Sequence, residues 1–253
     1  MIGRLLHHYN GRMQGPAHSR PRAILFDAGN TLLRMNYPAI ARHLAGRGHT
    51  VSIEAVEEAE QRARVRLDAH LASGVSTEGR PAQDRYIAYL LAALGLHAPE
   101  EVEAATTFKR DYNPPAGLFD SAIPGAQAAI RRAKTAGLAA GVISNSNGSV
   151  RALLEAAGLV GELDFVIDSA LVGVEKPDPR IFHLGLERAG VAPQEAVYIG
   201  DLYSIDVLGS RAAGLRSILL DPRGYWGERD CERAADLDAA LALVLGPIRK
   251  EPS

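Results

Sequence analysis

Short apolar runs alternate with longer periodic segments over much of the chain, and this pattern predicts most of its elements. The run AILF at residues 23–26 predicts a first strand, and further strands are expected in LAAGVISN, DFVID, AVYIG and SILLD. Gly, Pro and Asp punctuate the segments between them and predict helices at 124–136, 147–157, 179–189 and 204–213, with a last helix capped by Asp236. Apolar strands alternating with helices are typical of a parallel sheet covered on both faces. We therefore predict an α/β fold with a doubly wound parallel sheet.

A long helix is predicted in the middle of the chain, where no strand pattern occurs. Ser52 is expected to cap this helix, which runs to about Ala72. Its apolar stripe consists of Val56, Ala63 and Leu67. Two i,i+4 ion pairs are expected on its solvent-facing side, namely Glu58 with Arg62 and Glu60 with Arg64.

The sequence around this helix predicts a compact helical insertion. The small and polar stretch ASGVSTEGRP, residues 72–81, is expected to form a mobile loop. Two further helices are expected after the prolines at 81 and 99, and a turn is expected at Asn113-Pro114-Pro115. The predicted division of the chain is a core of 22–35 and 116–253 interrupted by a helical segment of 36–115.

Composition places the protein among ordinary globular chains. Of its 253 residues, 47% are hydrophobic and 23% charged, and the net charge of −2 gives no reason to expect a nucleic-acid or membrane partner. Cys231 is the single cysteine, which excludes an intramolecular disulfide and favours a cytoplasmic location. Residues 1–21 are rich in arginine, contain no acid and are interpreted as a flexible basic tail. No feature of the sequence predicts the oligomeric state.

Polar and charged side chains follow the predicted strands at the points where they end. In an open parallel sheet these ends meet at one edge, where ligands bind. The groups expected there are Asp27, Ser144 with Asn145, Lys176, Asp201 and Asp206. Each alone is most often a simple helix or turn cap, but together they form an unusual collection. Several carboxylates favour Mg²⁺, and a lysine with a hydroxyl favours a phosphoryl group, which Asp27 could attack.

Four segments in this order resemble the motifs of the haloacid dehalogenase (HAD) superfamily. They are FDAGNTL, VISNS, VEKPDPRIF and IGDLYSIDVLGSRAAG. The resemblance covers about residues 20–245 and implies a Rossmann-like α/β core with an α-helical cap inserted after the first motif. It also implies a small phosphorylated substrate and Mg²⁺ as cofactor.

The resemblance implies a role for each motif residue. Asp27 would be the nucleophile and a magnesium ligand, and Lys176 would bridge this nucleophile and the phosphate. The other implied magnesium ligands are the Gly29 carbonyl, Asp201 and Asp206, of which Asp206 would act less directly or through Lys176. The other implied phosphate-binding groups are Thr31, Ser144 and the backbone of Asn145.

Position 29 departs from the motif of the HAD phosphatases, which have an acid–base Asp where this chain has Gly29. A Mg-dependent phosphatase acting on a phosphoric monoester or an acyl phosphate through an aspartyl phosphate is our leading interpretation. A catalytically weak or silent phosphate-binding protein is the main alternative. A haloacid dehalogenase or a phosphonatase is also considered, since both lack the second Asp. The retained Asp201 and Asp206 favour phosphate chemistry. Lys109, the only lysine in the cap segment, is interpreted as a solvent-exposed surface residue.

Overall fold

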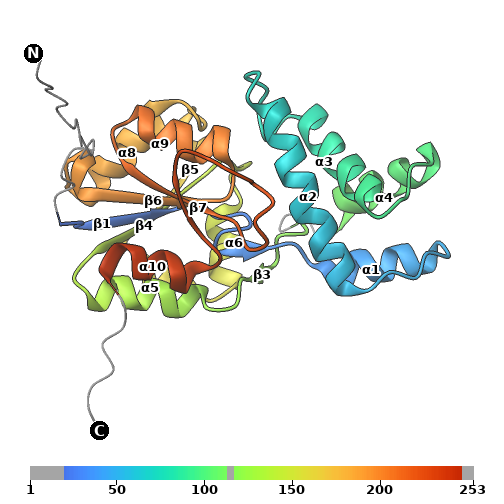
Figure 1. Ribbon diagram of the computed structural model, residues 1–253, viewed down its shortest axis with the longest axis horizontal. Helices are drawn as coiled ribbons and strands as arrows, with labels where there is room; N and C mark the ends of the chain where they lie inside the picture. Colours follow the sequence, from blue (N-terminus) through green and yellow to red (C-terminus); the bar gives the residue numbers. More distant parts are fainter. Residues whose placement is uncertain (1–19, 113–116, 247–253) are drawn as a thin grey trace, which may run out of the picture.

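The computed structural model describes residues 20–112 and 117–246, which form an α/β core and a separate group of helices (Figure 1). The tail predicted for 1–21 lies almost wholly outside these residues, as does the turn predicted at 113–115. In the described residues, no helix is both long and apolar enough to cross a membrane.

The core is built on a six-stranded parallel sheet with the strand order β5-β4-β1-β6-β7-β8. Its strands are β1 (Ala23–Phe26), β4 (Ala139–Ser144), β5 (Phe165–Asp168), β6 (Ala196–Gly200), β7 (Arg216–Leu220) and β8 (Glu232–Ala234). The first five coincide with the predicted apolar runs. Only β8 has no such signal, since two of its three residues are exposed and charged.

Helices cover both faces of the sheet because consecutive side chains of each strand point to opposite faces. Ile24 and Phe26 pack with α5 (Ala126–Thr135), α6 (Val150–Ala156) and α10 (Leu237–Leu245). Leu25 packs on the other face with α8 (Pro179–Ala189). Figure 1 shows α5 and α10 below the sheet, with α8 and α9 (Leu208–Ala212) above it. The predicted doubly wound fold is confirmed.

Four helices form a second group with an apolar cluster of its own. They are α1 (Tyr37–Gly46), α2 (Ile53–Leu71), α3 (Arg80–Ala93) and α4 (Pro99–Asp111). Ser52 caps α2 as predicted, since its hydroxyl accepts a hydrogen bond from Ala55 N at 3.1 Å. A short antiparallel pair of β2 (Leu33–Arg34) and β3 (Ser121–Ala122) lies where the chain leaves and re-enters the core. The domain boundaries at 36 and 115 stay a prediction.

One prediction about α2 is wrong, namely that Glu60 and Arg64 lie on its solvent-facing side. The stripe of apolar residues is buried as expected, and Glu58 and Arg62 form the predicted exposed pair. Glu60 and Arg64, however, are buried rather than solvated. The physical reason is that α2 is covered on two sides, by the other cap helices and by the core.

The helix predicted at 204–213 is divided into two parts. A π-helical turn, η3 (Tyr203–Val207), comes first, and α9 follows it. Single π-helical turns often occur at functional sites. The remaining short elements are α7 (Ser169–Val172) and the 3₁₀ turns η1 (Val160–Glu162) and η2 (Pro193–Glu195).

Candidate active site

The register of the sheet brings three strand ends together. Phe26, the last residue of β1, is paired with Val142 of β4 on one side and with Ile199 of β6 on the other. Asp27, immediately after β1, is fixed by its backbone N–H, which donates to Ile199 O at 2.9 Å. Asp27 therefore lies between the ends of β4 and β6, which is the arrangement that the sequence predicts.

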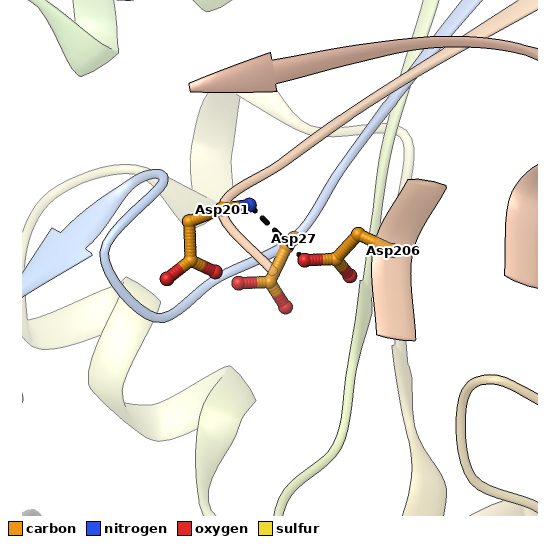
Figure 2. A group of neighbouring side chains, drawn as sticks. All are labelled: Asp27, Asp201 and Asp206. Carbon is orange, nitrogen blue, oxygen red and sulfur yellow. Dashed lines mark hydrogen bonds between the residues drawn. The ribbon is translucent and has the colours of Figure 1, made fainter. Parts of the chain in front are cut away.

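Three buried carboxylates meet at this edge. Oxygen atoms of Asp27, Asp201 and Asp206 all lie within 4.8 Å of one another. Figure 2 shows the side chains of Asp27 and Asp201 directed to the same space, with Asp206 on the far side of Asp27. The cluster is assembled from two loops and from η3, in agreement with the predicted set of acidic residues.

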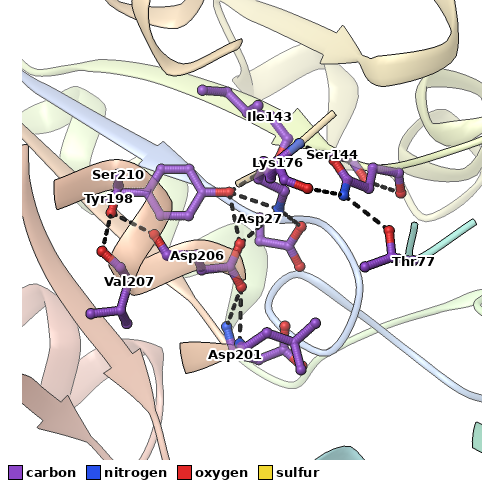
Figure 3. A network of polar contacts seen from close by, with 12 residues as sticks. Asp27, Thr77, Ile143, Ser144, Lys176, Tyr198, Asp201, Asp206, Val207 and Ser210 are labelled. Atoms are coloured by element: carbon purple, nitrogen blue, oxygen red, sulfur yellow. Dashed lines mark hydrogen bonds and ion pairs between the residues drawn. The ribbon is translucent and has the colours of Figure 1, made fainter. Parts of the chain in front are cut away.

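Lys176 joins two of these carboxylates (Figure 3). Its ammonium group donates to Asp27 Oδ1 at 2.6 Å, to Asp206 Oδ1 at 2.8 Å and to the Tyr198 hydroxyl at 2.9 Å. Although burial opposes its charge, the two carboxylates hold the pKa of Lys176 well above its usual range. Lys176 is therefore a permanent positive charge beside Asp27.

Asp206 is held from several directions and organises the site. Its Oδ2 accepts hydrogen bonds from the backbone N–H groups of Asp201 and Leu202, at 3.0 and 2.9 Å. Its Oδ1 accepts from Lys176. This packing requires Gly200, because a Cβ atom there would lie 2.4 Å from Asp206 Cγ. Both oxygens of Asp206 are thus engaged, which suits a residue that positions its neighbours.

The electrostatics of the cluster fit a bound cation. Burial raises the pKa of Asp27 to about 6 against the attraction of Lys176, and burial raises that of Asp201 well above its usual range. In their ion pairs with Lys176 and Arg64, Asp27 and Asp201 each use one carboxylate oxygen. Hard cations such as Mg²⁺ prefer carboxylate oxygens and typically take one or two of them together with phosphate oxygens. The donor set therefore fits Mg²⁺, with Asp27 and Asp201 as the direct carboxylate candidates.

A buried arginine from the cap reaches the same cluster. Arg64 donates to Asp201 Oδ2 at 3.0 Å and to Glu60 Oε2 at 3.0 Å. Glu60 also accepts from the hydroxyl of Tyr37 at 3.1 Å and from that of Tyr86. Sequence reasoning missed this network because i,i+4 ion pairs are common on solvated helix faces.

Further contacts hold the cap against the core. In η3, Ser204 donates from its backbone N and its hydroxyl to Asp68 Oδ1, at 2.8 and 2.7 Å. Asn30 donates to the Tyr86 hydroxyl at 3.2 Å. The φ angle of Asn30 is 52°, a left-handed conformation that Asn tolerates better than most residues. This explains why the chain can carry Asn at the fifth position of FDAGNTL.

The predicted phosphate-binding residues are brought together only in part. Ser144 is buried and lines the central cavity. The Asn145 side chain fixes the Lys176 backbone, since Oδ1 accepts from Lys176 N at 2.7 Å and Nδ2 donates to Lys176 O at 2.9 Å. Thr31 is fully buried, has no hydroxyl partner among the described residues and is not part of the cavity lining. Gly29 does line the cavity.

A cavity of about 630 Å³ lies between the carboxylate cluster and the cap helices. From the cap, its polar lining includes Arg64, Glu78, Gln83 and Lys109. The interpretation of Lys109 as a solvent-exposed residue is wrong. Lys109 is partly buried, donates to Gln83 Oε1 and has a pKa lowered by burial. The cap fold turns α4 inward at this position, which a short helical pattern does not reveal.

The motifs and this geometry agree with comparisons to known proteins. The sequence profile of the haloacid dehalogenase-like hydrolases matches residues 21–214. The chain belongs to this family of hydrolases. The resemblance of the motifs is thereby confirmed.

Relatives within the family include proteins named as phosphatases. The chain is 30% identical over 207 residues to haloacid dehalogenase-like hydrolase domain-containing protein 3 of Homo sapiens, covering 79% of this chain and 81% of the relative. It is 41% identical over 128 residues to phosphoserine phosphatase of Thermus thermophilus, covering 50% and 48%. It is 29% identical to ribulose-1,5-bisphosphate 5-phosphatase of Halopiger xanaduensis, covering 85% and 89%.

Solved structures of the same fold include dehalogenases and phosphatases. The L-2-haloacid dehalogenase RSc1362 is 24% identical, with a TM-score of 0.61 and coverage of 89% of this chain and 99% of that one. The HAD phosphatase from Thermococcus onnurineus is 21% identical, with a TM-score of 0.54 and coverage of 89% and 98%. These likenesses concern the fold and do not distinguish the two reactions.

Proposed function

We propose that this HAD-family hydrolase is a Mg²⁺-dependent phosphatase that acts on a small phosphorylated metabolite, either a monoester or an acyl phosphate. The observation that carries the proposal is the buried cluster of Asp27, Asp201 and Asp206 beside the fixed charge of Lys176. The relatives named as phosphatases support the same reaction class.

In the proposed reaction, an oxygen of Asp27 attacks the phosphorus atom and forms an aspartyl phosphate. Lys176 orients Asp27 and balances charge on the phosphoryl oxygens. Ser144 and the backbone N–H of Asn145 would donate hydrogen bonds to those oxygens. Asp27, Asp201 and the Gly29 carbonyl would hold Mg²⁺, with Asp206 positioning them. The ion would add positive charge where negative charge develops on the phosphoryl group.

The proposal is tested by phosphate release from a panel of aryl, acyl and alkyl phosphates. We expect release with Mg²⁺, none with EDTA and none from Asp27→Asn. Intact mass spectrometry of a briefly incubated sample should detect a phosphoryl group on the wild-type chain and not on the variant. Phosphate binding without release on any substrate, in a folded protein, would instead support a silent phosphate-binding role.

One observation favours a second candidate, metal-independent hydrolysis of a carbon–halogen bond. Arg64 already pairs with Asp201 at 3.0 Å, so a positive charge lies at the cluster without an ion. Halide leaves without a proton, so the reaction would need no acid at Gly29. This candidate predicts halide release from 2-haloacids that EDTA does not reduce.

A further inference from the structure

The cavity contains two cap carboxylates besides the acidic cluster. Among the described residues that line it, these are Glu78 and Asp84. Asp84 has a cation close by, since Arg80 Nε lies 3.5 Å from its Oδ2. In the described parts of the chain, no ion pair or hydrogen bond engages the Glu78 carboxylate. Glu78 is therefore an available acid in the same space as Asp27.

The loop that carries Glu78 is held to the core by hydrogen bonds of the two residues before it. Ser76 donates to Glu175 Oε2 at 2.9 Å, and Thr77 accepts from Asn145 Nδ2 at 2.9 Å. Figure 3 shows the second contact, with Thr77 approaching from the cap side. Asn145 and Glu175 adjoin Ser144 and Lys176 in the chain. The anchors thus lie on the loops predicted to bind the phosphoryl group, and they place Glu78 at this end of the cavity.

The surroundings of Glu78 suit a group that both gives and takes a proton. Glu78 is an exposed residue that also lines the cavity, so its carboxylate can exchange protons with solvent. Desolvation at the cavity wall raises its pKa to about 7 against the opposing charge of Lys109, and three carboxylates raise it further. The three carboxylates are those of Glu175, Asp168 and Asp27. A general acid–base group works best when its pKa lies near the working pH.

We propose that Glu78, from the cap, is the acid–base residue that replaces the carboxylate missing at position 29. This inference rests on the proposed phosphatase function. It requires Glu78 to contact the leaving-group oxygen of a bound substrate, which places that oxygen toward the loop at 75–79.

The proton transfers balance over two steps. In the first, Asp27 attacks phosphorus, the bond from phosphorus to the leaving oxygen breaks, and that oxygen takes the proton of Glu78. In the second, the Glu78 carboxylate takes a proton from water, whose oxygen attacks phosphorus and displaces Asp27. Glu78 is then protonated again, inorganic phosphate is released and Asp27 is a carboxylate once more.

The test compares Glu78→Gln with wild type on two kinds of substrate. We expect kcat for alkyl phosphates to fall about 10²–10⁴-fold, which is the usual contribution of general acid–base catalysis. With p-nitrophenyl phosphate, Glu78→Gln should lower the rate of Asp27 phosphorylation much less, because this leaving group departs readily as an anion. The pH dependence of kcat should lose the limb with an apparent pKa near 7. Asp84→Asn, which removes the other cap carboxylate of the cavity, is the matched control and should retain activity.

Rescue at position 29 separates a proton-transfer role from a structural one. A side chain fits there, since a Cβ atom on Gly29 would lie 3.5 Å from Phe119 in ordinary contact. Adding Gly29→Asp to the Glu78→Gln protein should raise its alkyl phosphatase activity at least tenfold. Adding Glu78→Gln to the Gly29→Asp protein should change this activity little. A structural defect would not be rescued in this way.

Three outcomes are distinguishable. Loss in Glu78→Gln with rescue by Gly29→Asp supports the inference. If Glu78→Gln leaves the phosphatase activity unchanged, or if Gly29→Asp does not rescue the activity that Glu78→Gln loses, the role of Glu78 is overturned. The phosphatase proposal then still stands. No phosphate release and no phosphorylated chain from any variant overturns both.

Discussion

Replacing the nucleophile by its neutral analogue should stabilise the metal-free protein while abolishing phosphate release. Burial raises the pKa of Asp27 from its usual 3.8 to about 6, because desolvation outweighs the attraction of Lys176. The folded chain therefore holds this proton more tightly than the unfolded chain, and ionising Asp27 destabilises the fold. Each pKa unit corresponds to about 1.4 kcal/mol, so the ionised carboxylate lowers the free energy of unfolding by roughly 3 kcal/mol.

The sign of this effect sets its pH window. Well below pH 3.8, Asp27 is protonated in both states and its ionisation has no effect on stability. The destabilisation grows as the pH rises from 3.8 to about 6 and is complete above that value. Asp27→Asn resembles the protonated form in shape and charge. Its advantage in the free energy of unfolding should therefore be near zero in acid and about 3 kcal/mol at neutral pH and above.

Urea unfolding in the presence of EDTA, followed at several pH values, measures this difference. Adding Mg²⁺ should stabilise the wild type, by about 2.7 kcal/mol at a hundred times its Kd, and should stabilise Asp27→Asn less. The difference in the free energy of unfolding between the two proteins should therefore become smaller when Mg²⁺ is added. A variant less stable than wild type at pH 8 in EDTA would refute the reasoning, because it would mean that the ion pair with Lys176 outweighs the burial of charge.

Two other substitutions test the packing of the site. Arg64→Met should lower the free energy of unfolding, measured in urea, by about 3–5 kcal/mol, because it leaves buried carboxylates without their cation. The exposed control Arg62→Met should change this free energy little. Equal effects of the two substitutions would contradict the buried network. Gly200→Ala should cost about 1–3 kcal/mol through overpacking against Asp206 and should weaken Mg²⁺ binding measured by calorimetry. Its control, Gly46→Ala, adds a methyl group in open space and should leave both unchanged, and intact Mg²⁺ affinity in Gly200→Ala would argue against the positioning role of Asp206.

The sheet and most of the acidic cluster could be predicted from the sequence because both follow from local signals. Apolar runs such as AVYIG indicate buried strands, and parallel pairing forces the residues after them to one edge. Asp27 and Asp201 meet for that reason. The assignment needs no knowledge of how the helices pack.

The cap side of the site could not be predicted, because it depends on how one set of helices packs against another surface. The spacing of Glu60 and Arg64 is the same on a solvated face and on a buried one, so periodicity cannot tell the two apart. Lys109 lies near the end of α4, and its burial depends on how that helix packs in the cap. Glu78 lies in a short polar loop whose position is set by the tertiary contacts of Ser76 and Thr77. These contacts join residues about 70 to 100 positions apart and leave no local pattern.

The acidic cluster and its lysine draw on segments spread from residue 27 to residue 206. A nascent chain halted before β6 contains Asp27 and Lys176 but lacks Asp201 and Asp206. Activity at this edge would therefore report that β1 and β6 have paired and that the loop with Lys176 has docked on them. A fragment that ends before β6 should be inert, however well it folds.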